Sequence, residues 1–202
     1  MRLKPPKFIR WLIPDLIWEM KDRSAVYLTF DDGPTPGITE WILSTLDKYD
    51  AKATFFVLGK NAEMYPDLYR RILDAGHRIG NHTYSHQKGW GMSLERYIED
   101  VDFANDLLHT ELFRPPYARI TPAQARALAK RYKLVMWDVL SRDYNRALSP
   151  RTCLRNVTRY LEGGSIVVFH DSEKSFRNMS YALPRTLQAV RDMGLKCKAI
   201  DL

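Results

Sequence analysis

The chain has 202 residues, a formal net charge of +7 at pH 7 and a hydrophobic fraction of 45%. This length predicts one domain with its own core, and this composition excludes disordered, collagen-like and fibrous proteins. No apolar run reaches the ~18 residues that a membrane-spanning helix needs. The two cysteines, Cys153 and Cys197, lack the spacing of a zinc site or a disulfide scaffold, so we expect two ordinary thiols.

Basic residues are spread along the chain rather than gathered in runs. The longest basic stretches are pairs, such as Arg70-Arg71 and Lys130-Arg131. A nucleic-acid-binding segment typically has a longer run of Lys and Arg, so we expect no nucleic-acid partner. The charge predicts a basic solvated surface, with an anionic glycan or a membrane-proximal substrate as the alternative.

Residues 1–24 combine positive charge with apolar side chains. The apolar residues, among them Phe8, Trp11 and Leu16, recur at roughly helical spacing, but Pro14 interrupts them and no small-residue cleavage site follows. This pattern argues against a cleaved signal peptide and leaves a cytoplasmic or a surface-associated location open. We expect an amphipathic segment packed on the domain, with peripheral membrane contact as the alternative.

From residue 25 onwards, short apolar strands alternate with amphipathic helices. Strands are predicted at residues 25–30, 53–58, 77–80, 112–114, 134–137, 165–169 and 196–200. Helices are predicted at residues 38–49, 66–75 and 93–109, from 121, from 149 to before 163, and at 182–193. This alternation predicts a parallel α/β domain, either a doubly wound sheet or a barrel. Polar residues follow several different strands, which favours a barrel with its site at the carboxyl ends of the strands.

Two acidic residues and two histidines stand where predicted strands end. Asp31 and Asp32 belong to the segment TFDDGP, in which a Gly-Pro turn allows both carboxylates to reach one pocket. His82 and His86 lie four residues apart, so a helical turn or a tight loop would let both imidazoles bind one metal ion. A carboxylate from Asp31 or Asp32 would complete a three-residue site with open positions on the ion. A solvated acidic turn and an unrelated histidine pair are the alternatives.

Further polar or aromatic residues follow the later strands. Arg114 precedes two prolines, which fix an extended backbone and place its guanidinium to orient a carboxylate. Trp137 and Asp143 lie at and after the end of the fifth strand. His170 ends a buried strand, where a carboxylate partner would raise its pKa and suit it to act as a general acid. Each of these residues, taken alone, also fits a structural role.

Taken in order, these segments resemble the five motifs of the polysaccharide deacetylase family, carbohydrate esterase family 4, with its NodB homology domain. The segments are TFDDGP at 29–34, HTYSH at 82–86, RPP at 114–116, the Asp143 segment with the upstream Trp137, and VFH at 168–170. The resemblance implies a distorted, NodB-like (β/α) barrel of about seven strands over residues 25–202. It also implies a hydrolase that removes N-acetyl groups from sugars of a polysaccharide or oligosaccharide.

The resemblance assigns four residues to the reaction itself. Asp31 would be the general base, and Arg114 would orient its carboxylate. His170 would be the general acid, and Asp143 would tune its pKa. These assignments imply metal-assisted hydrolysis of an amide bond.

The resemblance assigns five further residues to binding. Asp32, His82 and His86 would hold a divalent metal ion, with zinc the first choice and cobalt, nickel or another divalent ion as alternatives. The backbone N–H of Tyr117 would help to stabilise the oxyanion. Trp137 would form a wall of the acetyl or sugar pocket, and the implied partner is an N-acetylated carbohydrate.

The chain departs from the family pattern at two positions. Val168 replaces the usual leucine of the last motif, and Tyr144 replaces the usual tryptophan after Asp143. The second change affects the pocket wall and therefore the substrate. An O-acetyl esterase, a hydrolase of another C–N bond and a non-catalytic glycan-binding module are the alternative functions. The sequence makes no prediction of an oligomeric state.

Overall fold

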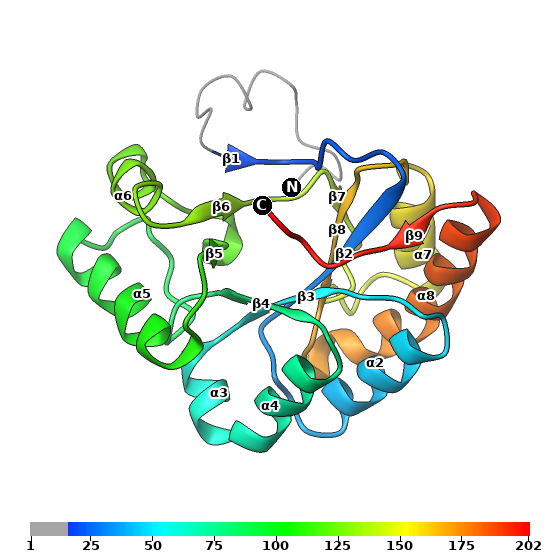
Figure 1. Ribbon diagram of the computed structural model, residues 1–202, viewed down its shortest axis with the longest axis horizontal. Helices are drawn as coiled ribbons and strands as arrows, with labels where there is room; N and C mark the ends of the chain where they lie inside the picture. The colour runs from blue at the N-terminus through cyan, green and yellow to red at the C-terminus, as the bar shows by residue number, and fades with distance from the viewer. Residues whose placement is uncertain (1–15) are drawn as a thin grey trace.

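A curled parallel β-sheet forms the centre of the protein, and helices lie around its outer face (Figure 1). The structure is a computed structural model, and it describes residues 16–202. The strands are β1 Leu16–Ile17, β2 Ala25–Asp31, β3 Thr54–Val57, β4 Arg78–Asn81, β5 Leu112–Phe113, β6 Lys133–Val135, β7 Val139–Leu140, β8 Ile166–His170 and β9 Lys196–Cys197. The helices are α2 Ile38–Asp47, α3 Gly59–Met64, α4 Pro66–Asp74, α5 Leu94–Leu108, α6 Pro122–Leu128, α7 Pro150–Thr158 and α8 Glu173–Asp192, with a 3-10 turn, η1, at Pro116–Ala118.

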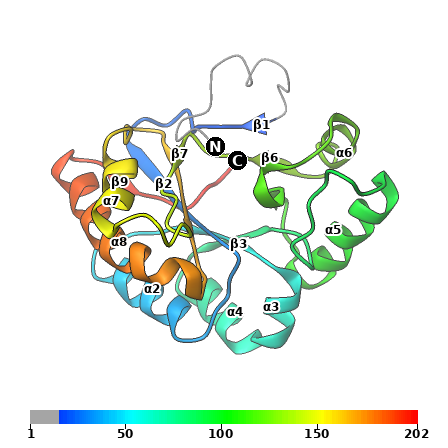
Figure 2. The same ribbon diagram turned by 180° about the vertical axis from the view of Figure 1, so that it is seen from behind.

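The two ends of the sheet are joined by the chain itself. The strand order is β1-β6-β5-β4-β3-β2-β8-β7, with β9 beside β2. Residues 133–140 contain both β6, which is next to the end strand β1, and β7, which is the strand at the other end of the order. Within it, the Met136 N–H donates to the Ile17 carbonyl at 2.7 Å and the Asp138 N–H to the Ile166 carbonyl at 3.3 Å. The sheet therefore curls into the distorted barrel that the sequence predicts (Figure 2).

Alternation along β2 and β8 decides which side chains face the barrel interior. In β2, Phe30 packs in the core beneath the helices, whereas Tyr27 belongs to the interior cluster. Because side chains alternate along a strand, Asp31 is on the interior side with Tyr27. Asp31 and His170 are register partners in the parallel pair of β2 and β8. The last residues of two neighbouring strands are thus placed side by side at the carboxyl edge.

The predicted seven strands are confirmed within a few residues at each end, although the last one extends only over Lys196–Cys197. The predicted starts of α6 and α7 are confirmed by their caps. Thr121 Oγ1 accepts from the Gln124 N–H at 3.2 Å, and Ser149 Oγ accepts from the Thr152 N–H at 3.1 Å. These side chains satisfy N–H groups that the first turn of a helix leaves without a partner.

The predicted start of the last helix is wrong. α8 begins at Glu173 and not at residue 182, and it contains Pro184 in its interior. The buried face of its first half includes Ser175 and Asn178. Because this half of the buried face carries polar side chains, apolar periodicity does not reveal it.

Four short elements have no counterpart in the predictions, namely α3, η1, β1 and β7. Residues Leu16–Ile17 form a strand that pairs with β6. The helical conformation that the spacing of the apolar residues indicates there is therefore wrong. Leu16, Trp18 and Met20 are buried in the interior cluster. The rest of the predicted amphipathic segment, residues 1–15, lies outside the described residues. No helix within residues 16–202 combines the length and apolarity needed to cross a membrane.

The closing stretch of the barrel should contribute strongly to stability. Leu134 is fully buried and is paired on both sides, with Leu16 and with Phe113. We expect Leu134→Ala to lower the free energy of unfolding by about 2–5 kcal/mol, because it leaves a cavity between three strands. Leu73, which is 44% exposed on α4, is the matched control, and Leu73→Ala should change stability by less than about 1 kcal/mol. Urea denaturation of both variants measures the difference, and equal losses would contradict this account.

Candidate active site

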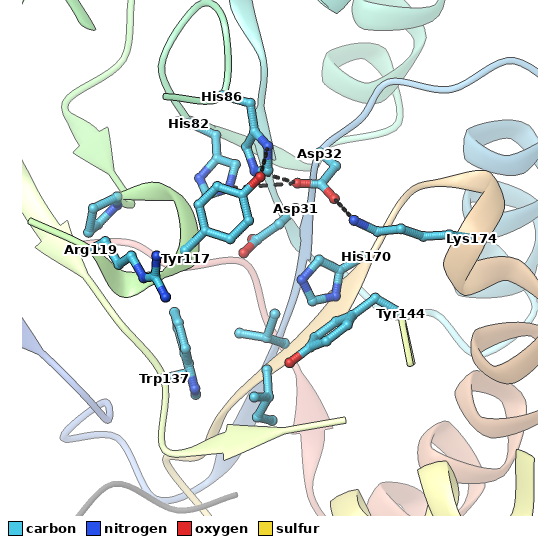
Figure 3. A pocket seen from close by; sticks show the side chains of 13 residues that line it. Asp31, Asp32, His82, His86, Tyr117, Arg119, Trp137, Tyr144, His170 and Lys174 are labelled. Atoms are coloured by element: carbon cyan, nitrogen blue, oxygen red, sulfur yellow. Dashed lines mark hydrogen bonds and ion pairs between the residues drawn. The ribbon is translucent and has the colours of Figure 1, made fainter. Parts of the chain in front are cut away.

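A cavity of about 220 Å³ opens at the carboxyl ends of the strands (Figure 3). Its lining combines acidic, imidazole and aromatic side chains with two cations. The lining residues are Asp31, Asp32, His82, His86, Pro115, Tyr117, Arg119, Trp137, Leu140, Tyr144, Val168, His170 and Lys174. Seven of the nine residues singled out from the sequence line this cavity. The other two, Arg114 and Asp143, are fully buried behind it and contact Asp31 and His170.

The turn after β2 brings two consecutive carboxylates into one pocket. Asp32 has φ 83°, a left-handed conformation that Asp tolerates better than most residues. The turn therefore breaks the strand alternation, and both Asp31 and Asp32 line the cavity. Gly33 is required next to them, because a Cβ there would overlap the carboxylate of Asp171. Asp171 is in turn fixed by a hydrogen bond from Thr39 Oγ1.

A buried arginine holds the carboxylate of Asp31. Arg114 Nη1 lies 2.7 Å from Asp31 Oδ1 and donates also to Thr29 Oγ1 at 2.7 Å. Its remaining nitrogens donate to the carbonyls of Val135 at 3.1 Å and Met136 at 2.9 Å. The guanidinium is therefore well supplied with acceptors although the side chain is fully buried. Charge-assisted bonds of this kind fix a carboxylate in one orientation.

Asp32, His82 and His86 form a three-residue cluster whose potential ligand atoms lie within 4.8 Å of one another. His86 Nε2 lies 3.1 Å and His82 Nε2 3.8 Å from Asp32 Oδ1. The two histidines belong to the loop after β4, in which Thr83 and His86 have positive φ. The four-residue spacing of His82 and His86 therefore brings the two imidazoles together in a tight loop and not on a helical turn.

The second ring nitrogen of each histidine in this cluster has its own partner. His82 Nδ1 lies 2.7 Å from the Arg114 carbonyl, which only accepts, so Nδ1 carries the proton and Nε2 keeps its lone pair. His86 Nδ1 lies 3.1 Å from the Tyr117 hydroxyl. Such outer contacts orient metal-binding imidazoles. Burial lowers the pKa of His82 to about 4, so its imidazole is neutral at neutral pH.

The charge state of Asp32 also suits metal binding. Burial raises the pKa of this carboxyl group, but the hydrogen bond from His86 and the neighbouring imidazoles outweigh burial. Together they hold the pKa of Asp32 well below its ordinary value. An ionised carboxylate and two imidazoles form a donor set that fits zinc or another borderline divalent ion.

His170 is paired with a buried carboxylate. Its Nδ1 lies 2.8 Å from Asp143 Oδ1, and its backbone N–H donates to Asp143 Oδ2 at 2.7 Å. Burial by itself lowers the pKa of His170, but the charge and hydrogen bond of Asp143 raise it to about 9. Because Nδ1 is engaged with Asp143, Nε2 is the nitrogen left for the cavity that His170 lines. The imidazole is thus a protonated acid at neutral pH.

Aromatic side chains form the walls of the cavity. Trp137, which the family resemblance implies as a pocket wall, and Tyr117, whose backbone N–H it implies as an oxyanion donor, both line the cavity. Tyr117 lies in η1 with φ 59°, so its peptide has a conformation that few residues adopt. Tyr144, which replaces the tryptophan of the family pattern, also lines the cavity and packs edge-on against His170 at 4.9 Å. The replacement keeps an aromatic wall at this position.

Two cations in the cavity lining were not predicted from the sequence. Lys174 Nζ lies 3.7 Å from Asp32 Oδ2. Arg119 lines the opposite side of the cavity, next to Tyr117 (Figure 3). Lys174 belongs to the first turn of α8, a part of the helix that apolar periodicity does not reveal. Arg119 follows η1 directly. Its position at the cavity depends on the backbone conformation of this turn after the two prolines, which the sequence pattern does not indicate.

Comparison with known proteins places this arrangement in a family. Over 158 residues the chain is 36% identical to the peptidoglycan-N-acetylglucosamine deacetylase of Bacillus cereus, covering 75% of this chain and 57% of that protein. It is 30% identical over 186 residues to the peptidoglycan-N-acetylmuramic acid deacetylase PdaC of Bacillus subtilis, covering 89% of this chain and 38% of that protein. The chain thus spans less than two thirds of the length of both relatives.

A solved structure resembles nearly the whole chain. The crystal structure of the Bc1960 peptidoglycan N-acetylglucosamine deacetylase superimposes with a TM-score of 0.88 at 29% sequence identity, covering 97% of this chain and 95% of that one. A family model described as polysaccharide deacetylase matches residues 19–137, more than half of the sequence. The chain therefore belongs to the polysaccharide deacetylase family.

Proposed function

We propose that this protein is a metal-dependent deacetylase that hydrolyses the acetamide of N-acetylated sugars in a polysaccharide or oligosaccharide. One observation carries the proposal: an arginine-held carboxylate, an Asp-His-His cluster and a carboxylate-paired histidine meet in one cavity. The two named relatives act on N-acetylglucosamine and N-acetylmuramic acid of peptidoglycan. Bacterial cell-wall glycan is therefore the substrate class that we propose first.

Asp32, His82 and His86 would hold the metal ion. Their ligand atoms converge within 4.8 Å, and a neutral His82 with an ionised Asp32 gives the protonation states that a cation needs. When bound, a divalent ion supplies a Lewis acid that polarises the acetamide carbonyl and lowers the pKa of a bound water. Zinc is the first choice for this donor set, with cobalt or nickel as alternatives.

Asp31 would act as the general base. Arg114 occupies Oδ1 of this carboxylate, and Asp31 lines the cavity next to the cluster. An oriented carboxylate at this position accepts the proton of the attacking water. The bond to Arg114 keeps the accepting oxygen turned toward the substrate.

His170 would act as the general acid. An amine leaves readily only if its nitrogen is protonated, and Nε2 of His170 carries a proton at neutral pH because of Asp143. The register pairing of Asp31 in β2 with His170 in β8 supports this role, because it brings the two side chains close together. The proposed base and acid would therefore both reach one substrate bound in the cavity.

The remaining predicted residues would bind the substrate. The backbone N–H of Tyr117 would donate to the developing oxyanion, and the ring of Trp137 would pack against the acetyl group or sugar. Both residues line the cavity. Fixed donors aimed at an oxyanion are among the strongest contributions to acyl transfer.

Substitution of the proposed base and substitution of a proposed metal ligand should have different effects on activity and on metal binding. We expect Asp31→Asn to lower acetate release from N-acetylglucosamine oligomers by about 10²-fold or more, with the metal still bound. His82→Ala should weaken metal binding by about 10-fold or more, since it removes a ligand. Acetate assays and metal analysis of both purified variants measure the two effects. A near wild-type rate for Asp31→Asn, or full metal content in His82→Ala, would show that the role assigned to that residue is wrong.

The pKa of His170, the proposed general acid, should determine the alkaline limb of the pH profile of kcat. His170 is protonated below a pKa of about 9, so kcat should be maintained up to that pH and fall above it as the imidazole loses its proton. Asp143→Asn removes the charge that raises this pKa, so the alkaline limb should move to lower pH by about one unit or more. Asp67→Asn, a change at a side chain that is 90% exposed, is the control and should leave the limb in place. A limb that stays unmoved in Asp143→Asn would contradict the pairing.

A further inference from the structure

The loop after His86 carries an exposed tryptophan beside the cavity. Trp90 is 59% exposed, and Tyr117, which lines the cavity, is 49% exposed. Tyr117 in turn packs against His86 at 4.6 Å between ring centroids. Large exposed aromatic rings next to a cavity are typical of binding surfaces, because leaving them in water is unfavourable.

Hydrogen bonds hold this loop in place against the turn that follows Tyr117. The Gly89 N–H donates to the Arg119 carbonyl at 2.8 Å, and Trp90 Nε1 donates to the Ile120 carbonyl at 3.2 Å. Gln124 Nε2 donates to the Gly89 carbonyl at 2.9 Å. Any side chain at Gly89 would collide with Arg119 and Gln124, so only glycine permits this approach. The indole is therefore held at a fixed position although most of it is exposed.

Two cations lie on these exposed rings. The Arg119 guanidinium lies 5.4 Å from the Trp90 ring, and Lys88 Nζ lies 5.2 Å from the Tyr117 ring. Within residues 16–202 neither side chain forms an ion pair. On the opposite side of the cavity, Lys174 already faces the carboxylate of Asp32. The side with Arg119 and Lys88 is therefore the one with positive charge left for a ligand.

We propose that Trp90, Lys88 and Arg119 form a subsite that binds an anionic sugar residue next to the sugar in the catalytic cavity. The apolar face of the sugar ring packs on Trp90, and its carboxylate is bound by Arg119 with support from Lys88. Arginine suits this task because its fork matches a carboxylate in two parallel hydrogen bonds. This subsite rests on the proposed function, and it narrows the substrate to a glycan with a negative charge beside the acetamide that is hydrolysed.

Binding measurements with two matched glycans test the subsite. One is a tetrasaccharide of alternating N-acetylglucosamine and N-acetylmuramic acid, and the other is the same tetrasaccharide with its carboxyl groups reduced to alcohols. Calorimetric titration uses the full chain with Asp31→Asn, and acetate is quantified to show that the glycan is not consumed. We expect the charged glycan to bind about 5-fold tighter than the reduced one, and added salt to remove the difference.

The variants separate stacking from charge. Trp90→Ala should weaken binding of both glycans by about 5-fold, whereas Trp90→Phe, which keeps a ring but loses the bond to Ile120, should retain most of the affinity. Arg119→Gln should weaken binding of the charged glycan by about 5-fold and change that of the reduced glycan little. The matched control is Arg159→Gln at the end of α7, where an exposed arginine lies 5.5 Å from the Tyr160 ring away from the cavity lining. This control should change neither affinity.

Each outcome bears on the subsite or on the proposed function. No binding of either glycan, or unchanged affinities in Trp90→Ala and Arg119→Gln, would overturn the subsite. Equal losses for both glycans in Arg119→Gln would overturn its anionic character. Turnover of a small acetyl ester by the wild-type protein reports on the catalytic centre alone. If the expected binding pattern is found but neither ester nor glycan releases acetate, the proposed function fails and the subsite stands.

Discussion

The ion pair between Arg114 and Asp31 is the contact on which the rest of the site depends. A guanidinium in the interior of a barrel is very unfavourable unless its donors are satisfied, and here its bonds reach β2 and the backbone at residues 135–136. The ring of Phe56 lies beneath it at 3.9 Å. The Arg114 carbonyl also fixes the tautomer of His82. One residue therefore ties together the proposed base, a proposed metal ligand and the stretch that closes the barrel. Loss of the Arg114 side chain would leave the Asp31 carboxylate buried without its partner, which costs about 3–5 kcal/mol.

Electrostatic surroundings then give each imidazole a different task. His82 is buried and His170 is partly buried, and burial alone lowers the pKa of each. Only His170 has a carboxylate partner at 2.8 Å that is strong enough to reverse the effect. The same residue type is thus neutral at one wall of the cavity, as the proposed metal ligand must be, and protonated at the other, as the proposed general acid must be. The difference follows from the placement of Asp143, which β7 and the loop after it bring behind His170.

The sequence predicts the parts of the site that follow regular structure and fails where local geometry decides. Asp31 and His170 end apolar strands, so strand periodicity and the rule that parallel α/β sites form at carboxyl edges are sufficient to place them. The four-residue spacing of His82 and His86 indicates a shared ion but does not show that a tight loop, with two positive φ values, brings them together. Lys174 was missed because the first half of α8 buries polar side chains. The strands β1 and β7 have only two residues each, and their pairing depends on barrel closure, a tertiary effect without local signal.

The division between scaffold and loops also explains where substrate selection resides. The proposed base and acid stand at strand ends, held by register and by buried partners, so their geometry tolerates little change. Tyr117, Arg119 and Trp90 come from the η1 turn and the loop after His86, which are joined by a backbone hydrogen bond and by contacts of the Trp90 and Tyr117 side chains. Changes in such segments alter the surface offered to a sugar without moving the reacting groups. On the proposed function, the barrel holds the groups that would hydrolyse the acetamide, and these two loops form the surface that we propose selects the glycan.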